Sequence, residues 1–378
     1  MIINLRWSFA GACVLGAFVT GSASAETYDF SGLTRLAVGA VLGQNVHDPV
    51  PGFEIRLLKD GEVLYHRSFG DWSIDRPANA DSSTKTMSGA LVMSVIDRSN
   101  LPMTLDSNIG TYLPSFRVPD KQNITIRQAF SHTSGLGGSN SEVGDPALAA
   151  TDISLRQAAA IIAQRPLLSG PPGTQFAYGG ASMHVVGAAL EVATDTPFVD
   201  LFAQRISGPL QLTNTRFVLA SDTNPRVSGG IESTASDFSR FMDMLLNDGV
   251  DRVTGARILS AESVREMLTR QTTDSQSIVN SPVDNNRYGV GVWLDQLGQA
   301  GPTVDAVAGG ARGFHSWIDA PHGIVFTFAT DTSAFSNVEV LSSMMHAEIL
   351  RAIPEPATSA LAFAALCLIT RRRCGPKH

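Results

Sequence analysis

Strand-like segments stand near both ends of the chain and enclose a long stretch of helical pattern. Near the N-terminus, PGFEIRLLKDGEVLYHRSFGDW carries two strand-like runs around Asp60-Gly61, a pair that favours a β-hairpin turn. Strand character returns at RYGVGVWLD, HSWIDA and GIVFTFATD, whereas residues 101 to about 280 are mainly helical in pattern. We therefore expect an α+β fold, in which distant segments form an antiparallel sheet flanked by helices beside a mainly helical lobe. A ligand cleft is expected between the two lobes.

The length of 378 residues allows one large composite domain or two smaller ones. Apolar residues make up 43% of the chain and charged residues 17%, which is enough apolar material for a core. We assign residues 26–352 to one exported domain. Its sheet lobe is expected at about 30–100 and 285–352, and its helical lobe at about 101–284.

The first 25 residues have the pattern of a secretory signal peptide. They contain Arg6, the apolar run FAGACVLGAFV and the small-residue end TGSASA, which is typical of a signal-peptidase site. The alternative is an N-terminal core helix. We expect residues 1–25 to be removed and the mature protein to be exported.

Residues 353–378 have the pattern of a sorting or anchor segment. The apolar run from Ala357 to Thr370 is shorter than the roughly 20 residues that a membrane helix needs. The arginines at 371–373 would stay on the cytoplasmic side and hold the preceding domain outside. The order of Pro-Glu-Pro, apolar run and arginines resembles the bacterial PEP-CTERM signal. That resemblance implies transient membrane association, processing by an exosortase-like enzyme and delivery to the cell surface or extracellular matrix; a plain short anchor is the alternative.

Charge and cysteine content exclude several classes of function. The formal net charge of −7 gives no basic surface for nucleic acid. Cys13, Cys367 and Cys374 all lie in the terminal segments, so the domain has no thiolate nucleophile and no cysteine metal site. No HExxH pair is present either. We expect neither a metal nor a cofactor.

The segment DSSTKTMSG, residues 81–89, places a lysine three residues after a serine at the start of an apolar helix. Residues i and i+3 share one helix face, so Ser82 and Lys85 are expected to touch. A lysine partly desolvated in a cleft accepts the proton of a serine hydroxyl and makes that serine a nucleophile. An N-cap serine followed by a solvated lysine is the alternative interpretation of these residues alone.

The segment DSSTKTMSGALVMSVIDRSNLPMTLDSNIGTYLPSF resembles the opening of the serine β-lactamase and penicillin-binding protein-like family, which includes class C β-lactamase-type esterases. Further landmarks follow in the family order: ITIRQAFSHTSGL, LSGPPGTQFAYGGASMHVVGAALEVATDTPF, GGIESTASDFSRFMDMLLNDG and YGVGVWLD. The resemblance extends from about Phe30 to Ala352. It implies a β-lactamase/transpeptidase-like fold and serine hydrolase chemistry without a cofactor.

Carried over by position, the resemblance implies that Ser82 is the nucleophile, with Lys85 and Tyr178 sharing the transfer of protons. It also implies that the backbone N–H groups of Ser82 and Ala311 form the oxyanion hole. Gly180, Gly310 and Arg312 are candidate substrate-binding residues. Arg312 either binds a substrate carboxylate or is an exposed turn residue. For His315, we leave open whether it faces the cleft or covers the sheet, and we interpret His132 as structural.

Two positions depart from the family pattern. Gly180 stands where many members have Asn, and Ala308 stands where a Lys or His is common. These losses weaken the case for β-lactam or D-amino-acid peptide substrates, whereas an ester leaves more readily. We expect an exported hydrolase that cleaves small carboxylic esters through an acyl-enzyme. A β-lactamase or D-amino-acid peptidase is the alternative enzyme, and a non-catalytic module that binds cell wall or matrix is the alternative from another class.

Overall fold

The structure, a computed structural model, describes residues 28–98, 102–137, 144–297, 305–332 and 335–353. The expected signal peptide and the expected PEP-CTERM-like segment lie outside these residues, apart from Ile353. Among the described residues, no helix has the length and apolar character that crossing a membrane requires.

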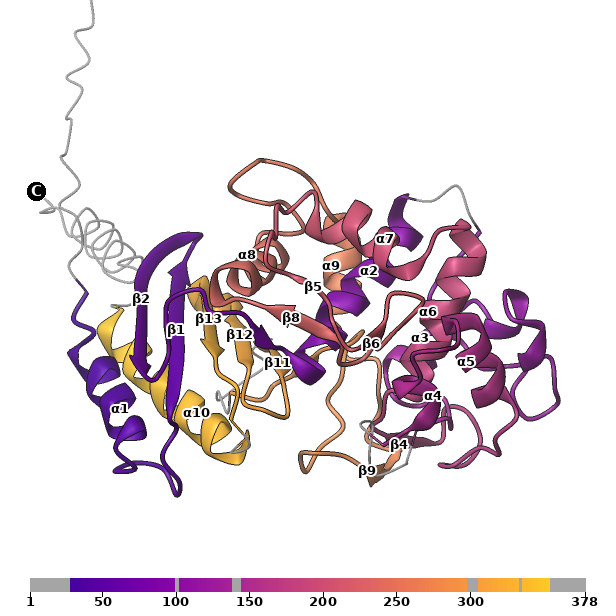
Figure 1. Ribbon diagram of the computed structural model, residues 1–378, viewed down its shortest axis with the longest axis horizontal. Coiled ribbons are helices and arrows are strands. Elements are labelled where there is room, and N and C mark those ends of the chain that lie inside the picture. The colour runs from indigo at the N-terminus through magenta and orange to yellow at the C-terminus, as the bar shows by residue number, and fades with distance from the viewer. Residues whose placement is uncertain (1–27, 99–101, 138–143, 298–304, 333–334, 354–378) are drawn as a thin grey trace, which may run out of the picture.

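One six-stranded antiparallel sheet is built from both ends of the domain (Figure 1). The strands lie in the order β10 (Trp293–Leu294), β11 (Asp305–Gly309), β12 (His315–Asp319), β13 (Ile324–Ala329), β1 (Gly52–Lys59) and β2 (Glu62–Gly70). The N-terminal β1 therefore pairs with the C-terminal β13. This arrangement confirms the expected α+β class and the expected sheet from distant segments.

The expected hairpin at Asp60-Gly61 joins β1 and β2. Both turn residues have positive φ, 49° for Asp60 and 84° for Gly61, as a two-residue hairpin turn of this kind requires. The φ of Gly61 is one that residues with a Cβ rarely adopt, which is why glycine suits this position.

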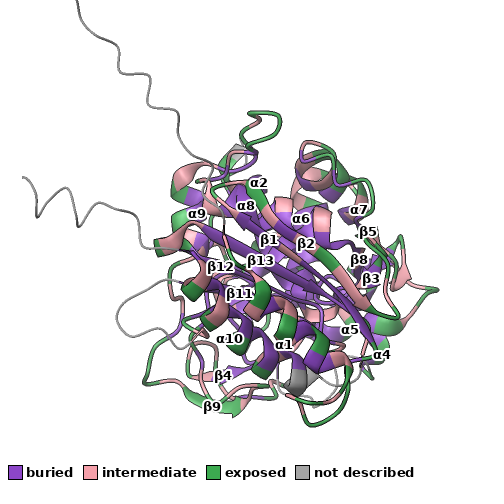
Figure 2. Ribbon diagram, turned by 90° about the vertical axis from the view of Figure 1, so that its left-hand side faces the viewer, coloured by how far each residue is buried: buried purple, intermediate pink, exposed green. Residues whose placement is uncertain are grey.

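Helices cover both faces of the sheet (Figure 2). On one face lie α1 (Ser31–Val41) and α10 (Phe335–Ala352), which also pack against each other. On the other face lies α8 (Ala235–Leu246), against β1, β12 and β13. The indole Nε1 of Trp317 in β12 donates to Oγ of Ser342 at 2.9 Å, which fixes α10 on the sheet.

The middle of the chain forms a mainly helical lobe. Its helices are α3 (Ile126–Phe130), α4 (Pro146–Ala149), α5 (Leu155–Ala163), α6 (Ala181–Thr194), α7 (Phe198–Phe202) and α9 (Ala261–Met267), with short turns η2 (Ile109–Thr111), η3 (Pro114–Phe116) and η4 (Ala203–Ser207). Thr125 and Ser154 begin α3 and α5 through capping boxes with the glutamines three residues later.

Short strands that the sequence did not predict occur within this helical region, and one before it pairs with them. They are β3 (Ala78–Asn79), β8 (Ile231–Ser233) and β5 (Arg216–Phe217) in one sheet, the parallel pair β4 (Gln175–Ala177) and β9 (Ser277–Asn280), and the pair β6 (Ala220–Ser221) and β7 (Asn224–Pro225). Segments of two to four residues are too short to show an alternating pattern.

Helix α2 (Thr84–Arg98) runs through the interior between the lobes and follows the short turn η1 (Asp81–Ser83). It contacts α7, α9 and η4 on one side and β11 on the other. Met87, Leu91 and Val95 are fully buried, as expected from their spacing. The N-terminus of α2 thus lies where the two lobes meet.

Candidate active site

Ser82 lies in η1, immediately before α2. Nζ of Lys85 donates to Oγ of Ser82 at 3.0 Å, so the expected contact between these residues is present. The same Nζ donates to the backbone carbonyl of Ser228 at 2.9 Å, and Lys85 is 1% exposed. A buried lysine held beside a serine hydroxyl is placed to exchange a proton with it.

Long-range contacts fix the turn that carries Ser82. Oγ of Ser83 lies 3.0 Å from the carbonyl oxygens of both Ala308 and Phe314, which ties η1 to β11 and β12. A Cβ at Gly310 would lie 2.3 Å from the carbonyl oxygen of Ala80, so only glycine permits this approach. The end of β11, and with it Ala311, is thereby held beside the nucleophile.

Tyr178 follows β4 and is held by Asn280 of β9. The backbone N–H of Tyr178 donates to the carbonyl of Asn280, and Nδ2 of Asn280 donates to the carbonyl of Tyr178, both at 2.7 Å. The Tyr178 ring stacks on Trp293 with centroids 5.5 Å apart. Nζ of Lys85 lies 4.7 Å from the centre of the Tyr178 ring. The structure thus brings Ser82, Lys85 and Tyr178 into one group, called here the nucleophile cluster.

His132 packs behind this cluster, with its ring centroid 4.4 Å from that of Tyr178 and 4.7 Å from that of Tyr288. Burial, together with the positive charge of Lys85, lowers the pKa of His132 well below its ordinary value. The N–H of Gly179 donates to its Nδ1 at 3.4 Å. His132 is therefore a neutral, buried support for Tyr178.

A cleft of about 430 Å³ opens beside Ser82. Of the residues expected at the site, Ser82, Tyr178, Gly310, Ala311 and His315 line it. The rest of the lining is partly apolar: Pro282, Val283, Trp293, Leu297 and Val307. Lys85 lies behind Ser82, and Gly180 is the residue before α6, adjacent to the lining residue Gly179. His315 is 4% exposed, and burial lowers its pKa to about 4, so it is neutral at pH 7.

Arg312 is engaged by the protein itself. Its guanidinium makes two hydrogen bonds to the carboxylate of Asp81, at 2.9 and 2.8 Å, and its backbone N–H makes a third at 3.1 Å. Asp81 has a φ of 46°, in the left-handed region that non-glycine residues rarely adopt. Arg312 is not among the residues that line the cleft. Its position points to holding the backbone before Ser82.

The structure places four further side chains at the cleft that the sequence did not single out: Arg226, Asn280, Trp293 and Glu339. Arg226 precedes the landmark GGIESTASD by only three residues, which is the one sequence signal for its position. Trp293, on β10, lies within the landmark YGVGVWLD, whereas Asn280 on β9 and Glu339 on α10 are marked by no local pattern.

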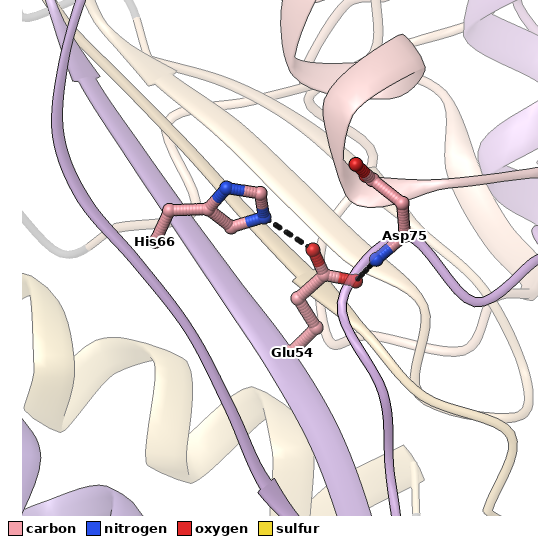
Figure 3. A group of neighbouring side chains, drawn as sticks. All are labelled: Glu54, His66 and Asp75. Carbon is pink, nitrogen blue, oxygen red and sulfur yellow. Dashed lines mark hydrogen bonds and ion pairs between the residues drawn. The ribbon is translucent and has the colours of Figure 1, made fainter.

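A second polar group, the hairpin cluster, consists of Glu54, His66 and Asp75 (Figure 3). Nε2 of His66 bonds to one carboxylate oxygen of Glu54, and the N–H of Asp75 donates to the other at 2.9 Å. Nδ1 of His66 lies 2.9 Å from the guanidinium of Arg56. The carboxylate of Glu54 is thus bonded to His66 and to the backbone of Asp75, and the Asp75 carboxylate accepts from the N–H of Ser236 at 3.2 Å. The possible metal-ligand atoms are engaged by the protein, which points to a structural role.

Comparison with known proteins agrees with this geometry. Over residues 41–340, the chain matches the family described as Beta-lactamase. It is 29% identical over 289 residues to Protein Rv1367c of Mycobacterium tuberculosis (strain ATCC 25618 / H37Rv). This match covers 62% of this chain and 70% of the relative.

Two further proteins show the range of the family. The chain is 26% identical over 288 residues to a D-aminopeptidase of Cereibacter sphaeroides (strain ATCC 17023); the match covers 70% of this chain and about half, 53%, of the relative. The structure is similar to that of a family VIII carboxylesterase, with a TM-score of 0.66 and 17% identity, over 83% of this chain and 96% of the other. The family match extends over most of the described domain and includes Ser82, Lys85 and Tyr178, so the chain belongs to the β-lactamase family of serine hydrolases.

Proposed function

We propose that the protein hydrolyses small carboxylic esters through an acyl-enzyme on Ser82. The observation that carries this proposal is the 3.0 Å contact between Nζ of Lys85 and Oγ of Ser82 at the edge of a cleft. A serine hydroxyl becomes an effective nucleophile when a neighbouring group accepts its proton. Lys85 and Tyr178 are the groups placed to do so.

The proposed reaction runs in two halves. Oγ of Ser82 attacks the ester carbonyl carbon while its proton passes to the Lys85–Tyr178 pair, and the N–H groups of Ser82 and Ala311 stabilise the oxyanion. The C–O bond to the alcohol then breaks, and the alcohol leaves with that proton. Water next attacks the acyl carbon and gives up a proton to the same pair. The bond between the acyl carbon and Oγ then breaks, the pair passes that proton to Oγ of Ser82, and the carboxylic acid product is released.

Leaving-group chemistry, two departures from the family pattern and the lining of the cleft favour esters over amides. An alkoxide or phenoxide leaves more readily than the anion of an amine, so an ester needs less proton donation to the leaving group than an amide does. Ala308 and Gly180 remove a basic and an amide side chain that many family members have in these positions. The apolar part of the lining, including Val283 and Leu297, suits a short acyl chain. A carboxylesterase with this fold supports the proposal.

A D-amino-acid peptidase or a β-lactamase is the second candidate. The observation in its favour is the relationship to the D-aminopeptidase of Cereibacter sphaeroides. Its substrates would use the same Ser82 acyl-enzyme with an amine as leaving group. A third candidate is a module that binds cell wall or matrix without turnover. Such a module would not need the proton-transfer groups of the nucleophile cluster.

Hydrolysis of short-chain 4-nitrophenyl esters and of a chromogenic cephalosporin, by the wild type and by Ser82→Ala, distinguishes these candidates. We expect ester turnover that falls by about 10⁴-fold in the variant, with little cephalosporin cleavage. Fast cephalosporin turnover would favour the second candidate. Equal inertness of both proteins would favour the binding module.

We also propose that the protein is exported and reaches the cell surface or matrix, on the basis of residues 1–25 and 353–378. Immunodetection of the protein in cell, surface and medium fractions tests this, with a variant truncated after Ala352 as the comparison. Retention of both proteins inside the cell would contradict export.

A further inference from the structure

Arg226 is a cation that lines the cleft and has no counterion among the described residues. It lies between β7 and β8, and within the described residues its side chain makes no hydrogen bond or ion pair. Its Nε is buried and has no partner there. By contrast, Arg165, Arg240 and Arg312 each bind an aspartate through two nitrogens. A buried donor with no acceptor is unfavourable, and a ligand that supplies an acceptor removes that cost.

The stem of Arg226 lies beside the nucleophile. A Cβ at Gly229 would lie 3.5 Å from Cδ of Arg226 and 3.7 Å from the carbonyl carbon of Asp81, the residue before Ser82. The N–H of Gly229 donates to the carbonyl of Arg226 at 3.1 Å and closes the turn from Arg226 to Gly229. The next residue back, Ser228, accepts from Lys85. A group bound by the Arg226 guanidinium therefore lies within a few bonds of the carbonyl that Ser82 attacks.

The other charges at the cleft define what Arg226 attracts. Asp81 lines the cleft, but its carboxylate is neutralised by Arg312. His315 is neutral because of its burial. Glu339, on α10, has no ion-pair partner in the described part of the chain. An anionic substrate is therefore attracted by Arg226 and repelled by Glu339, so that it enters in one orientation.

We propose that Arg226 binds a carboxylate carried by the substrate close to the scissile carbonyl, so that the preferred substrates are acidic, such as half-esters of short dicarboxylic acids. Arginine suits this task because its planar guanidinium donates two parallel hydrogen bonds to a carboxylate. The inference rests on the proposed acyl transfer by Ser82 and adds a specificity-determining residue to it.

The first test compares two matched pairs of esters. Mono-4-nitrophenyl glutarate against 4-nitrophenyl butyrate places the charge on the acyl side, and 3-acetoxybenzoate against 3-acetoxybenzamide places it on the leaving group. We expect kcat/KM to favour the acidic member of at least one pair by roughly 10- to 100-fold. This ratio should fall to near 1 in Arg226→Gln and recover in part in Arg226→Lys. A wild type without preference, or a preference that survives Arg226→Gln, would overturn the inference.

Arg216→Gln is the matched control. Arg216 lies on β5, its side chain is 76% exposed, and it is not among the residues that line the cleft. The control should keep the wild-type ratio for both pairs. Spontaneous hydrolysis of the glutarate ester is subtracted with Ser82→Ala.

The second test does not depend on turnover. Calorimetric titration of Ser82→Ala should show glutarate binding at least about 10-fold more tightly than glutaramide, and Arg226→Gln in the same background should abolish the difference. If no ester is hydrolysed but this preference is found, the esterase proposal fails and the role of Arg226 stands. Equal binding of both compounds, or a preference that persists without Arg226, overturns the role of Arg226 whatever the protein hydrolyses.

Discussion

The nucleophile cluster and the hairpin cluster are both groups of polar side chains, but their polar atoms face different surroundings. In the hairpin cluster, both carboxylate oxygens of fully buried Glu54 are bonded within the cluster. In the nucleophile cluster, Ser82 and Tyr178 line a cleft of about 430 Å³. A buried polar group whose bonds all stay inside the protein holds structure, whereas one that faces a cleft is available to a ligand. Access to the cleft, rather than burial or charge, separates the two roles.

Removing the lysine of the nucleophile cluster should give the largest effect. We expect Lys85→Met to lower kcat for ester hydrolysis by about 10³-fold, because Ser82 loses the group beside it that accepts its proton. The measurement is steady-state hydrolysis of 4-nitrophenyl butyrate, with circular dichroism as the check on folding. Retained turnover in a folded variant would mean that another group acts as the base.

Removing the carboxylate of the hairpin cluster should lower stability but leave activity nearly unchanged, in contrast to Lys85→Met. Glu54→Ala leaves His66 and the N–H of Asp75 without their acceptor, so we expect the free energy of unfolding to fall by about 3 kcal/mol. The kcat/KM of the folded fraction should stay within about twofold of the wild type, since the cluster does not line the cleft.

Urea denaturation and ester hydrolysis measure the two quantities. Glu62→Ala, an exposed glutamate on the same hairpin, is the matched control and should change stability by less than about 0.5 kcal/mol. A loss of turnover in folded Glu54→Ala would break the distinction between the two clusters.

A pH series tests buried histidines in both lobes. Burial lowers the pKa of His184 and of His315 to about 4. The unfolded chain protonates these histidines near pH 6.5, whereas the folded chain protonates them only near pH 4. Burial of the two neutral rings therefore costs no stability above pH 6.5, and the free energy of unfolding falls as the pH drops from 6.5 toward 4.

Each of these histidines should remove about 2 kcal/mol of unfolding free energy between pH 7.5 and 5. His184→Gln should therefore show a shallower decline than the wild type in urea denaturation at the two pH values. His47→Gln replaces an exposed histidine and should keep the wild-type decline. An equal fall in unfolding free energy between the two pH values for the wild type and His184→Gln would contradict the lowered pKa of His184.

The smallest expected effect concerns the backbone of the nucleophile cluster. Arg312→Gln weakens the hold on Asp81, whose φ of 46° is unfavourable for a non-glycine residue. We expect kcat to fall by about 10-fold with KM little changed, because Ser82 is less firmly positioned. A rise in KM for acidic esters alone would instead indicate that Arg312 contacts the substrate.

Much of the fold was predictable because its signals are local. The Asp60-Gly61 hairpin and the buried stripe of Met87, Leu91 and Val95 follow from turn chemistry and helical spacing, and both are present. Strands of two or three residues, such as β3 and β5, were not predicted. They depend on pairing with distant segments and carry no periodic pattern of their own.

The sequence by itself predicted the Ser82–Lys85 contact, because residues three apart at the start of a helix lie on one face, and the structure shows that contact. Only the tertiary structure decided that Arg312 binds Asp81, 231 residues away, and that Arg226 and Glu339 line the same cleft as Ser82. The physical reason is the range of the interactions. Backbone geometry fixes neighbours within one turn, whereas the partners of a long charged side chain depend on how distant elements pack.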